Sequence, residues 1–103
     1  MTDPAVRARA IAGFLTLPGW RAQAAIVHHQ DANFTGIRFA TKAGWVVLEI
    51  PAGDQPYRLV HELPEPDAHG RTEVEMQRFP QVYKPRGIAH ITMEFLLSRG
   101  FLG

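Results

Sequence analysis

The sequence predicts an α+β domain with an N-terminal helix, a curved five-stranded antiparallel meander and a C-terminal helix, both helices packing on one face of the sheet. Three observations predict it. The chain has 103 residues, enough for one hydrophobic core and too few for two, so we expect residues 1–103 to form a single domain. Five strand-like runs are joined by connections shorter than the dozen residues that a parallel crossover needs. Segments with helical apolar spacing lie before and after these runs.

The first helix is expected from residue 4 to residue 16. Asp3 can cap the free N–H groups, Pro4 suits the first helical position, and Pro18-Gly19 ends the segment. Apolar side chains recur along it at helical spacing in one row, with a second row adjoining: Val6, Ala10, Phe14 and Leu17, then Ile11 and Leu15. We expect Phe14 to enter the core.

The central strand is expected at residues 45–50, Trp-Val-Val-Leu-Glu-Ile, because β-branched and aromatic residues dominate it and Pro51 stops it. Val46, Leu48 and Ile50 share one face, which must be core. The other face is mostly apolar too, which is compatible with a sheet covered on both sides at this strand. The remaining strands are expected near residues 24–29, 37–39, 57–63 and 71–79.

The second helix is expected from residue 86 to residue 99, and its polar stripe is narrow: His90, Glu94 and Ser98. Gly100 suits a left-handed position after the helix, and Phe101 is then placed to fold back on Leu96. The apolar surface of this helix and of Phe101-Leu102 exceeds what one sheet face needs. Surplus apolar surface predicts an interface, so we expect a homodimer through this helix or through an exposed edge strand.

Composition excludes several classes of protein. The chain is 46% hydrophobic and 20% charged, has no cysteine and carries a net charge of +1. Disulfides, thiol catalysis and cysteine-ligated metals are therefore excluded, and no stretch reaches the roughly 20 apolar residues of a membrane span. Arg7 and Arg9 before a short apolar run faintly resemble an export signal, but Gly13 and Thr16 interrupt that run. We expect a cytoplasmic protein.

Catalytic and metal motifs are missing from the sequence. Three of the five histidines would have to converge through the fold alone to hold a metal, and Ser98, the only serine, has no nucleophile context. We therefore predict no metal, no cofactor and no catalytic residue. One enzymatic alternative stays open, a small-ligand pocket in the curved sheet lined by Trp45, Tyr57 and His61.

Charge is unevenly placed along the chain. Residues 62–77 carry five acids and one arginine, and residues 78–103 carry a local charge of +3. The segment 78–86 mixes basic, aromatic and proline residues, and we take five of them as candidate partner contacts: Arg78, Phe79, Tyr83, Lys84 and Arg86. Such a segment can stack on bases and bind phosphates. The favoured interpretation is a connector whose Phe79, Val82 and Tyr83 fill the edge of the core, since proline-bounded loops usually route the chain.

The leading functional hypothesis is a non-catalytic protein-binding module. Inhibitor, immunity and adaptor roles fit the size and the lack of motifs, including that of a phage- or plasmid-borne inhibitor of a host defence complex. The first alternative is a nucleic-acid-binding domain that uses the 78–86 segment. The acidic stretch beside that segment favours a protein partner, because it would repel a phosphate backbone.

Overall fold

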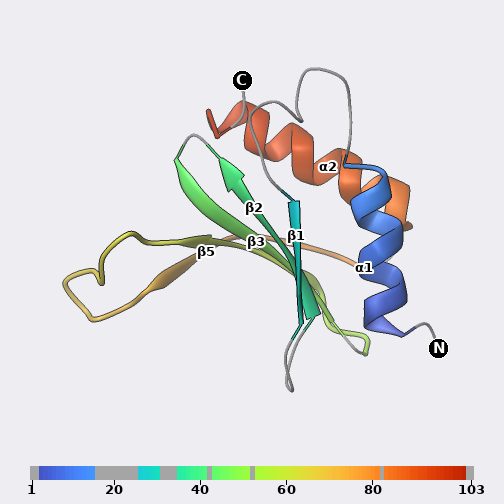
Figure 1. The fold of residues 1–103 in the computed structure, drawn as a ribbon, viewed down its shortest axis with the longest axis horizontal. Coiled ribbons are helices and arrows are strands. Elements are labelled where there is room, and N and C mark those ends of the chain that lie inside the picture. Colours follow the sequence, from blue (N-terminus) through green and yellow to red (C-terminus); the bar gives the residue numbers. More distant parts are fainter. Residues whose placement is uncertain are drawn as a thin grey trace.

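The sheet is a five-stranded antiparallel meander whose strands lie between two helices in the sequence, as predicted (Figure 1). The computed structural model describes residues 3–15, 26–30, 35–41, 43–51, 53–81 and 83–101. Strands pair in chain order, β1-β2-β3-β4-β5, each antiparallel to its neighbours. The elements are α1 (Pro4–Gly13), β1 (Ile26–Gln30), β2 (Thr35–Thr41), β3 (Gly44–Ile50), β4 (Tyr57–Glu62), β5 (Glu73–Phe79) and α2 (Pro85–Ser98).

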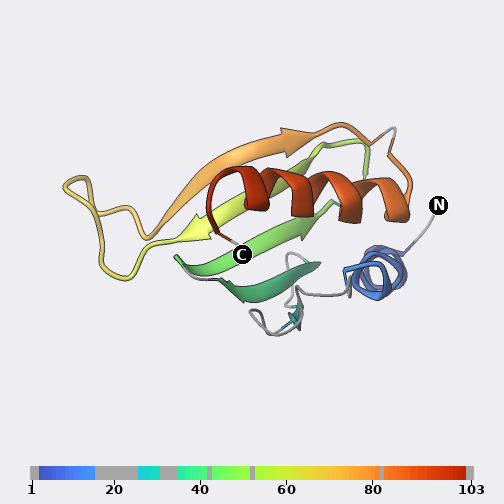
Figure 2. The same cartoon turned by 90° about the horizontal axis from the view of Figure 1, so that it is seen from above.

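Both helices pack on one face of the sheet, and one core lies between the layers (Figures 1 and 2). α2 runs over the sheet, and α1 packs beside it against α2 and the first three strands. The predicted central-strand residues Val46, Leu48 and Ile50 are buried there, while Ile91 and Phe95 are half-buried against them. Buried side chains from the helices complete the core: Ala8, Ile11, Leu15, Ile88, Ala89, Met93 and Leu96.

Local chemistry sets the ends of the helices. The Ala5 N–H donates to the Asp3 side chain at 2.8 Å, which confirms the predicted cap of α1. After α2, Gly100 adopts a φ of 79°, and the Phe101 N–H donates to the Leu96 carbonyl at 2.9 Å. With the 3.2 Å bond from Gly100 to Leu97, this is the Schellman motif, and it folds Phe101 back onto the core as predicted.

The prediction that Phe14 enters the core is wrong. α1 ends at Gly13, and Phe14 caps it with 46% of its surface exposed. The helix presents its other row to the core, because Ala8, Ile11 and Leu15 recur at three- and four-residue spacing and form a complete apolar stripe. The row of Val6, Ala10 and Phe14 is therefore left on the outer surface. Leu17, also assigned to that row, lies outside the described residues.

Candidate binding surfaces

The 78–86 segment does not form one surface. Phe79, at the end of β5, is buried and meets Phe95 edge to face, with ring centroids 6.4 Å apart. Arg78 lies beside it on the opposite face of the sheet, where its Nε is 2.9 Å from Glu75. Tyr83, Lys84 and Arg86 are exposed around the start of α2. Phe79 thus has the role that the connector interpretation gave it. For Tyr83 that interpretation is wrong, because this residue is 37% exposed, and Val82 lies outside the described residues.

Tyr83 lines a groove between α1 and the chain that leads into α2. This α1–connector groove has a volume of about 190 Å³ and is lined by Val6, Arg7, Ala10, Tyr57, Gln81, Tyr83 and Pro85. Val6 is 48% exposed and Tyr83 is 37% exposed, whereas Tyr57 is buried. Phe14 continues the apolar row of Val6 and Ala10 along α1. An apolar stripe and an aromatic ring are thus accessible side by side.

Side-chain hydrogen bonds hold the walls of the α1–connector groove together. Arg7 Nη1 donates to Gln81 Oε1 at 3.0 Å and to the Pro51 carbonyl at 3.5 Å. Gln81 Nε2 in turn donates to the carbonyls of Gly53 and Gln55, the latter at 2.8 Å. Gln81 therefore ties the connector to α1 and to the β3–β4 turn. The groove is pre-organised, which lowers the conformational entropy that binding would cost.

The basic residues around the α1–connector groove have no acidic partners among the described residues. Arg9, Lys84 and Arg86 are exposed, and none of them forms an ion pair with another residue in the described part of the chain. Arg7 itself bonds neutral oxygens. This side of the molecule therefore offers apolar area together with uncompensated positive charge.

The face of the sheet opposite the helices, the open sheet face, is built differently. Val47 and Val60 are buried there although no described helix covers them. Arginine and glutamate side chains lie around them in ion pairs: Arg38–Glu62 at 2.7 Å, Arg58–Glu49 at 2.9 Å, Arg58–Glu75 at 2.6 Å and Arg78–Glu75 at 2.9 Å. The aliphatic stems of these side chains exclude water from the two valines. This is how the second face of the central strand is covered.

The pKa values of two carboxylates in these ion pairs are shifted in opposite directions. The hydrogen bond from Arg58 lowers the pKa of Glu75, and Arg78 adds to the effect. Burial raises the pKa of Glu49, because the desolvation of its charge outweighs the attraction of Arg58.

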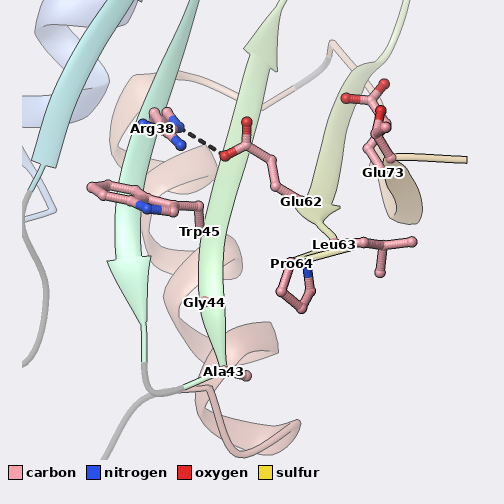
Figure 3. Close-up of a pocket in the computed structure, with 9 residues that line it drawn as sticks. Arg38, Ala43, Gly44, Trp45, Glu62, Leu63, Pro64 and Glu73 are labelled. Carbon is pink, nitrogen blue, oxygen red and sulfur yellow. Dashed lines mark hydrogen bonds and ion pairs between the residues drawn. The ribbon is translucent and has the colours of Figure 1, made fainter. Parts of the chain in front are cut away.

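A larger groove lies at one end of the open sheet face (Figure 3). This Trp45 groove has a volume of about 350 Å³. The Arg38 guanidinium stacks on Trp45, with its central carbon 4.0 Å from the centre of the ring, and its Nε forms an ion pair with Glu62 at 2.7 Å. The lining residues are Arg38, Ala43, Gly44, Trp45, Glu62, Leu63, Pro64, Thr72 and Glu73.

The predicted pocket of Trp45, Tyr57 and His61 does not form. His61 pairs in register with Val46, so it lies on the helix side, whereas Trp45 is one residue away and lies on the open sheet face. His61 Nε2 is 2.8 Å from the Ala43 carbonyl oxygen, and its ring meets Phe101 edge to face at 5.1 Å. Tyr57 lies in the α1–connector groove beneath Arg7. The period of two along a strand places Trp45 on the other face of the sheet from His61, and Tyr57 lies four residues from His61 along β4.

Histidines and acids do not converge in the described part of the chain. No three of its His, Asp or Glu side chains are placed to hold a metal ion. His90 Nε2 lies 3.2 Å from Glu94 on the exposed side of α2, within the polar stripe that the sequence predicted. None of the described helices is both long and apolar enough to cross a membrane.

The apolar surplus lies on α1 rather than on α2. Leu97 is the large apolar residue exposed on α2, and Arg86, His90, Glu94 and Ser98 are exposed on the same helix. Sequence reasoning missed Val6, Ala10 and Gln81 as surface residues of a groove. The sequence did contain a signal for this, the second apolar row of Ala8, Ile11 and Leu15. Only one of two adjoining rows on a helix can point into the core, so the other row stays on the surface.

Comparison of the chain with protein-family models, with curated proteins and with solved structures finds no match. The surfaces of the molecule are therefore the only indication of what it binds.

Proposed function

We propose that this chain is a non-catalytic protein-binding module that contacts its partner through the α1–connector groove. The observation that supports this best is the exposed row of Val6, Ala10 and Phe14 beside the exposed ring of Tyr83. Exposed contiguous apolar surface on a small domain commonly marks a site of protein association. Inhibitor, immunity or adaptor function, including inhibition of a host defence complex, fits such a surface.

The shape and chemistry of the groove favour a macromolecule over a small ligand. At about 190 Å³ it is smaller than the roughly 300–1,000 Å³ of typical small-molecule sites. Tyr and Arg side chains are enriched where protein interfaces concentrate their binding energy. The uncompensated charges of Arg9, Lys84 and Arg86 favour a partner surface that is acidic around an apolar anchor, and they would speed its association.

Capture of the partner from the native host tests this proposal. Immobilised wild-type protein is compared with Val6→Asp, which places a charge in the α1–connector groove, and with Leu97→Asp as the matched control. Val6 is 48% exposed and Leu97 is 55% exposed, so neither substitution should unfold the protein. We expect one host protein to be recovered with the wild type and with Leu97→Asp, and to be lost with Val6→Asp.

The opposite pattern would contradict the proposal. If Leu97→Asp abolishes capture and Val6→Asp does not, the outer face of α2 is the interface. If the captured protein proves to be a second copy of this chain, the α1–connector groove is a homodimer interface, whereas the sequence predicted a homodimer through α2 or an exposed edge strand. Light scattering of the purified protein measures the oligomeric state directly.

Nucleic acid is the second candidate ligand, because Arg9, Lys84 and Arg86 lack ion-pair partners among the described residues. Two residues on which the nucleic-acid hypothesis depended are placed unfavourably for it: Phe79 is buried, and Arg78 forms an ion pair with Glu75. A gel-shift titration at low salt separates the two ligands. If phosphates bind here, each of Lys84→Gln and Arg86→Gln should reduce the slope of log affinity against log salt by roughly 0.7–0.9.

A further inference from the structure

Two pairs of like charges stand directly opposite each other on the open sheet face, where β4 pairs with β5. Arg58 is in register with Arg78, and Glu62 is in register with Glu73. Like charges at such positions destabilise an antiparallel pair. The first pair is compensated within the chain, because Glu75 accepts from the Nε atoms of both arginines at 2.6 and 2.9 Å.

The second pair is compensated on one side only. Arg38 donates to Glu62 at 2.7 Å. Glu73 is exposed, and its carboxylate makes no ion pair or hydrogen bond with another described residue. The end of the sheet that carries Glu62 and Glu73 therefore lacks the bridging group of opposite charge that Glu75 provides for the arginine pair.

Both glutamates line the Trp45 groove, where apolar surface lies beside them. Figure 3 shows the groove from the side opposite α2, with Trp45, Glu62, Pro64 and Glu73 along its walls. Trp45 is half-buried, and its ring is already held against one guanidinium, that of Arg38. The groove therefore combines an aromatic ring fixed in place, a proline, and the carboxylate of Glu73, which has no ion-pair or hydrogen-bond partner among the described residues and is attracted only at longer range by Arg58.

We propose that the Trp45 groove binds an arginine side chain of a basic peptide segment from a partner protein. The guanidinium would bridge Glu62 and Glu73 as Glu75 bridges Arg58 and Arg78, with the charges reversed. A planar guanidinium can donate to two acceptors at once, and its apolar faces pack on rings and on proline, as Arg38 does on Trp45. This site lies on the opposite face of the sheet from the α1–connector groove, so it does not depend on the function proposed above.

A titration with a blocked peptide tests the site. The probe is an acetylated, amidated Gly-Arg-Gly-Arg-Gly peptide, and the control is the same peptide with citrulline, a neutral isostere, at both arginine positions. The indole N–H signal of Trp45, assigned with Trp45→Phe, reports binding in two-dimensional NMR spectra. We expect a saturable shift with the arginine peptide and none with the citrulline peptide.

Two glutamine substitutions make the test specific. Glu73→Gln removes the carboxylate without a partner, and we expect it to weaken the peptide about fivefold or more, as loss of about 1 kcal/mol would. Glu65→Gln makes the same change of charge at an exposed residue that does not line the groove, and should weaken the peptide less than about twofold. Equal losses in the two variants would overturn the proposal, because attraction would then be diffuse. So would the absence of a shift up to roughly 10 mM peptide.

Discussion

The two sides of this domain use the same residue types for different purposes. On the open sheet face, Arg38, Arg58 and Arg78 all pair with glutamates and cover Val47 and Val60. Around the α1–connector groove, exposed basic residues lack acidic partners in the described part of the chain, and apolar residues stay exposed. Charges satisfied inside the molecule contribute to its own fold. Charges and apolar groups left unsatisfied are the ones available to a partner.

The core between these sides sets the scale for stability. Leu48→Ala should lower the free energy of unfolding by about 2–5 kcal/mol, because it removes a fully buried side chain and leaves a cavity. Urea denaturation measures it, with the exposed Val74→Ala as a control expected within about 0.5 kcal/mol of the wild type. An unchanged midpoint for Leu48→Ala would mean that β3 is not the central strand.

Val60→Ala tests whether the ion-paired side chains of the open sheet face keep water away from the valines beneath them. Val60 is fully buried beside Arg58 and Glu62, and no helix in the described part of the chain lies above it. We expect the free energy of unfolding to fall by about 1.5–3 kcal/mol, from two lost methyl groups and a small cavity. A loss below about 0.5 kcal/mol would show that water reaches this valine and that the two sides of the sheet differ less than described.

Gln81→Ala tests the pre-organisation of the α1–connector groove. The substitution removes the bonds to Arg7 and to the carbonyls of Gly53 and Gln55. We expect a loss of about 1–2 kcal/mol in the free energy of unfolding and weaker capture of the partner. Gln55→Ala is the matched control, since it leaves the Gln55 carbonyl in place. If the two substitutions change the free energy of unfolding and the capture of the partner equally, Gln81 does not pre-organise the groove.

The smallest expected effect is the response of the open sheet face to pH. The pKa of Glu75 is lowered from 4.5, so its contribution to stability is present above that value and is lost as the pH falls through the lowered pKa. The pKa of Glu49 is raised, so its contribution has the opposite sign: it is present below 4.5 and is lost as the pH rises through the raised value.

Thermal unfolding of two variants between about pH 6 and pH 3 separates these contributions. Glu75→Gln should flatten the acid-induced fall in the melting temperature, and Glu49→Gln should steepen it. If both variants follow the wild-type profile, the ion pairs of the open sheet face contribute nothing measurable.

Sequence patterns predicted the elements well because most patterns were unambiguous. The Trp45 strand, the meander and the Gly100 turn each follow from spacing or from turn chemistry over a few residues. α1 was ambiguous, since Val6-Ala10-Phe14 and Ala8-Ile11-Leu15 are both apolar rows, and packing against α2 selected the second. The grooves could not be predicted, because Gln81 meets Arg7 from a distance of 74 residues and Glu62 faces Glu73 only through the register of β4 and β5.

Site-specific photo-crosslinking in the native host tests the central claim most directly. A photoreactive phenylalanine replaces Tyr83, which is 37% exposed in the α1–connector groove, or Leu97, which is 55% exposed on α2. We predict a single crosslinked partner protein from position 83 and none from the more exposed position 97. Crosslinks of equal yield from both positions, or a partner captured from position 97 alone, would contradict the assignment of the α1–connector groove as the binding surface.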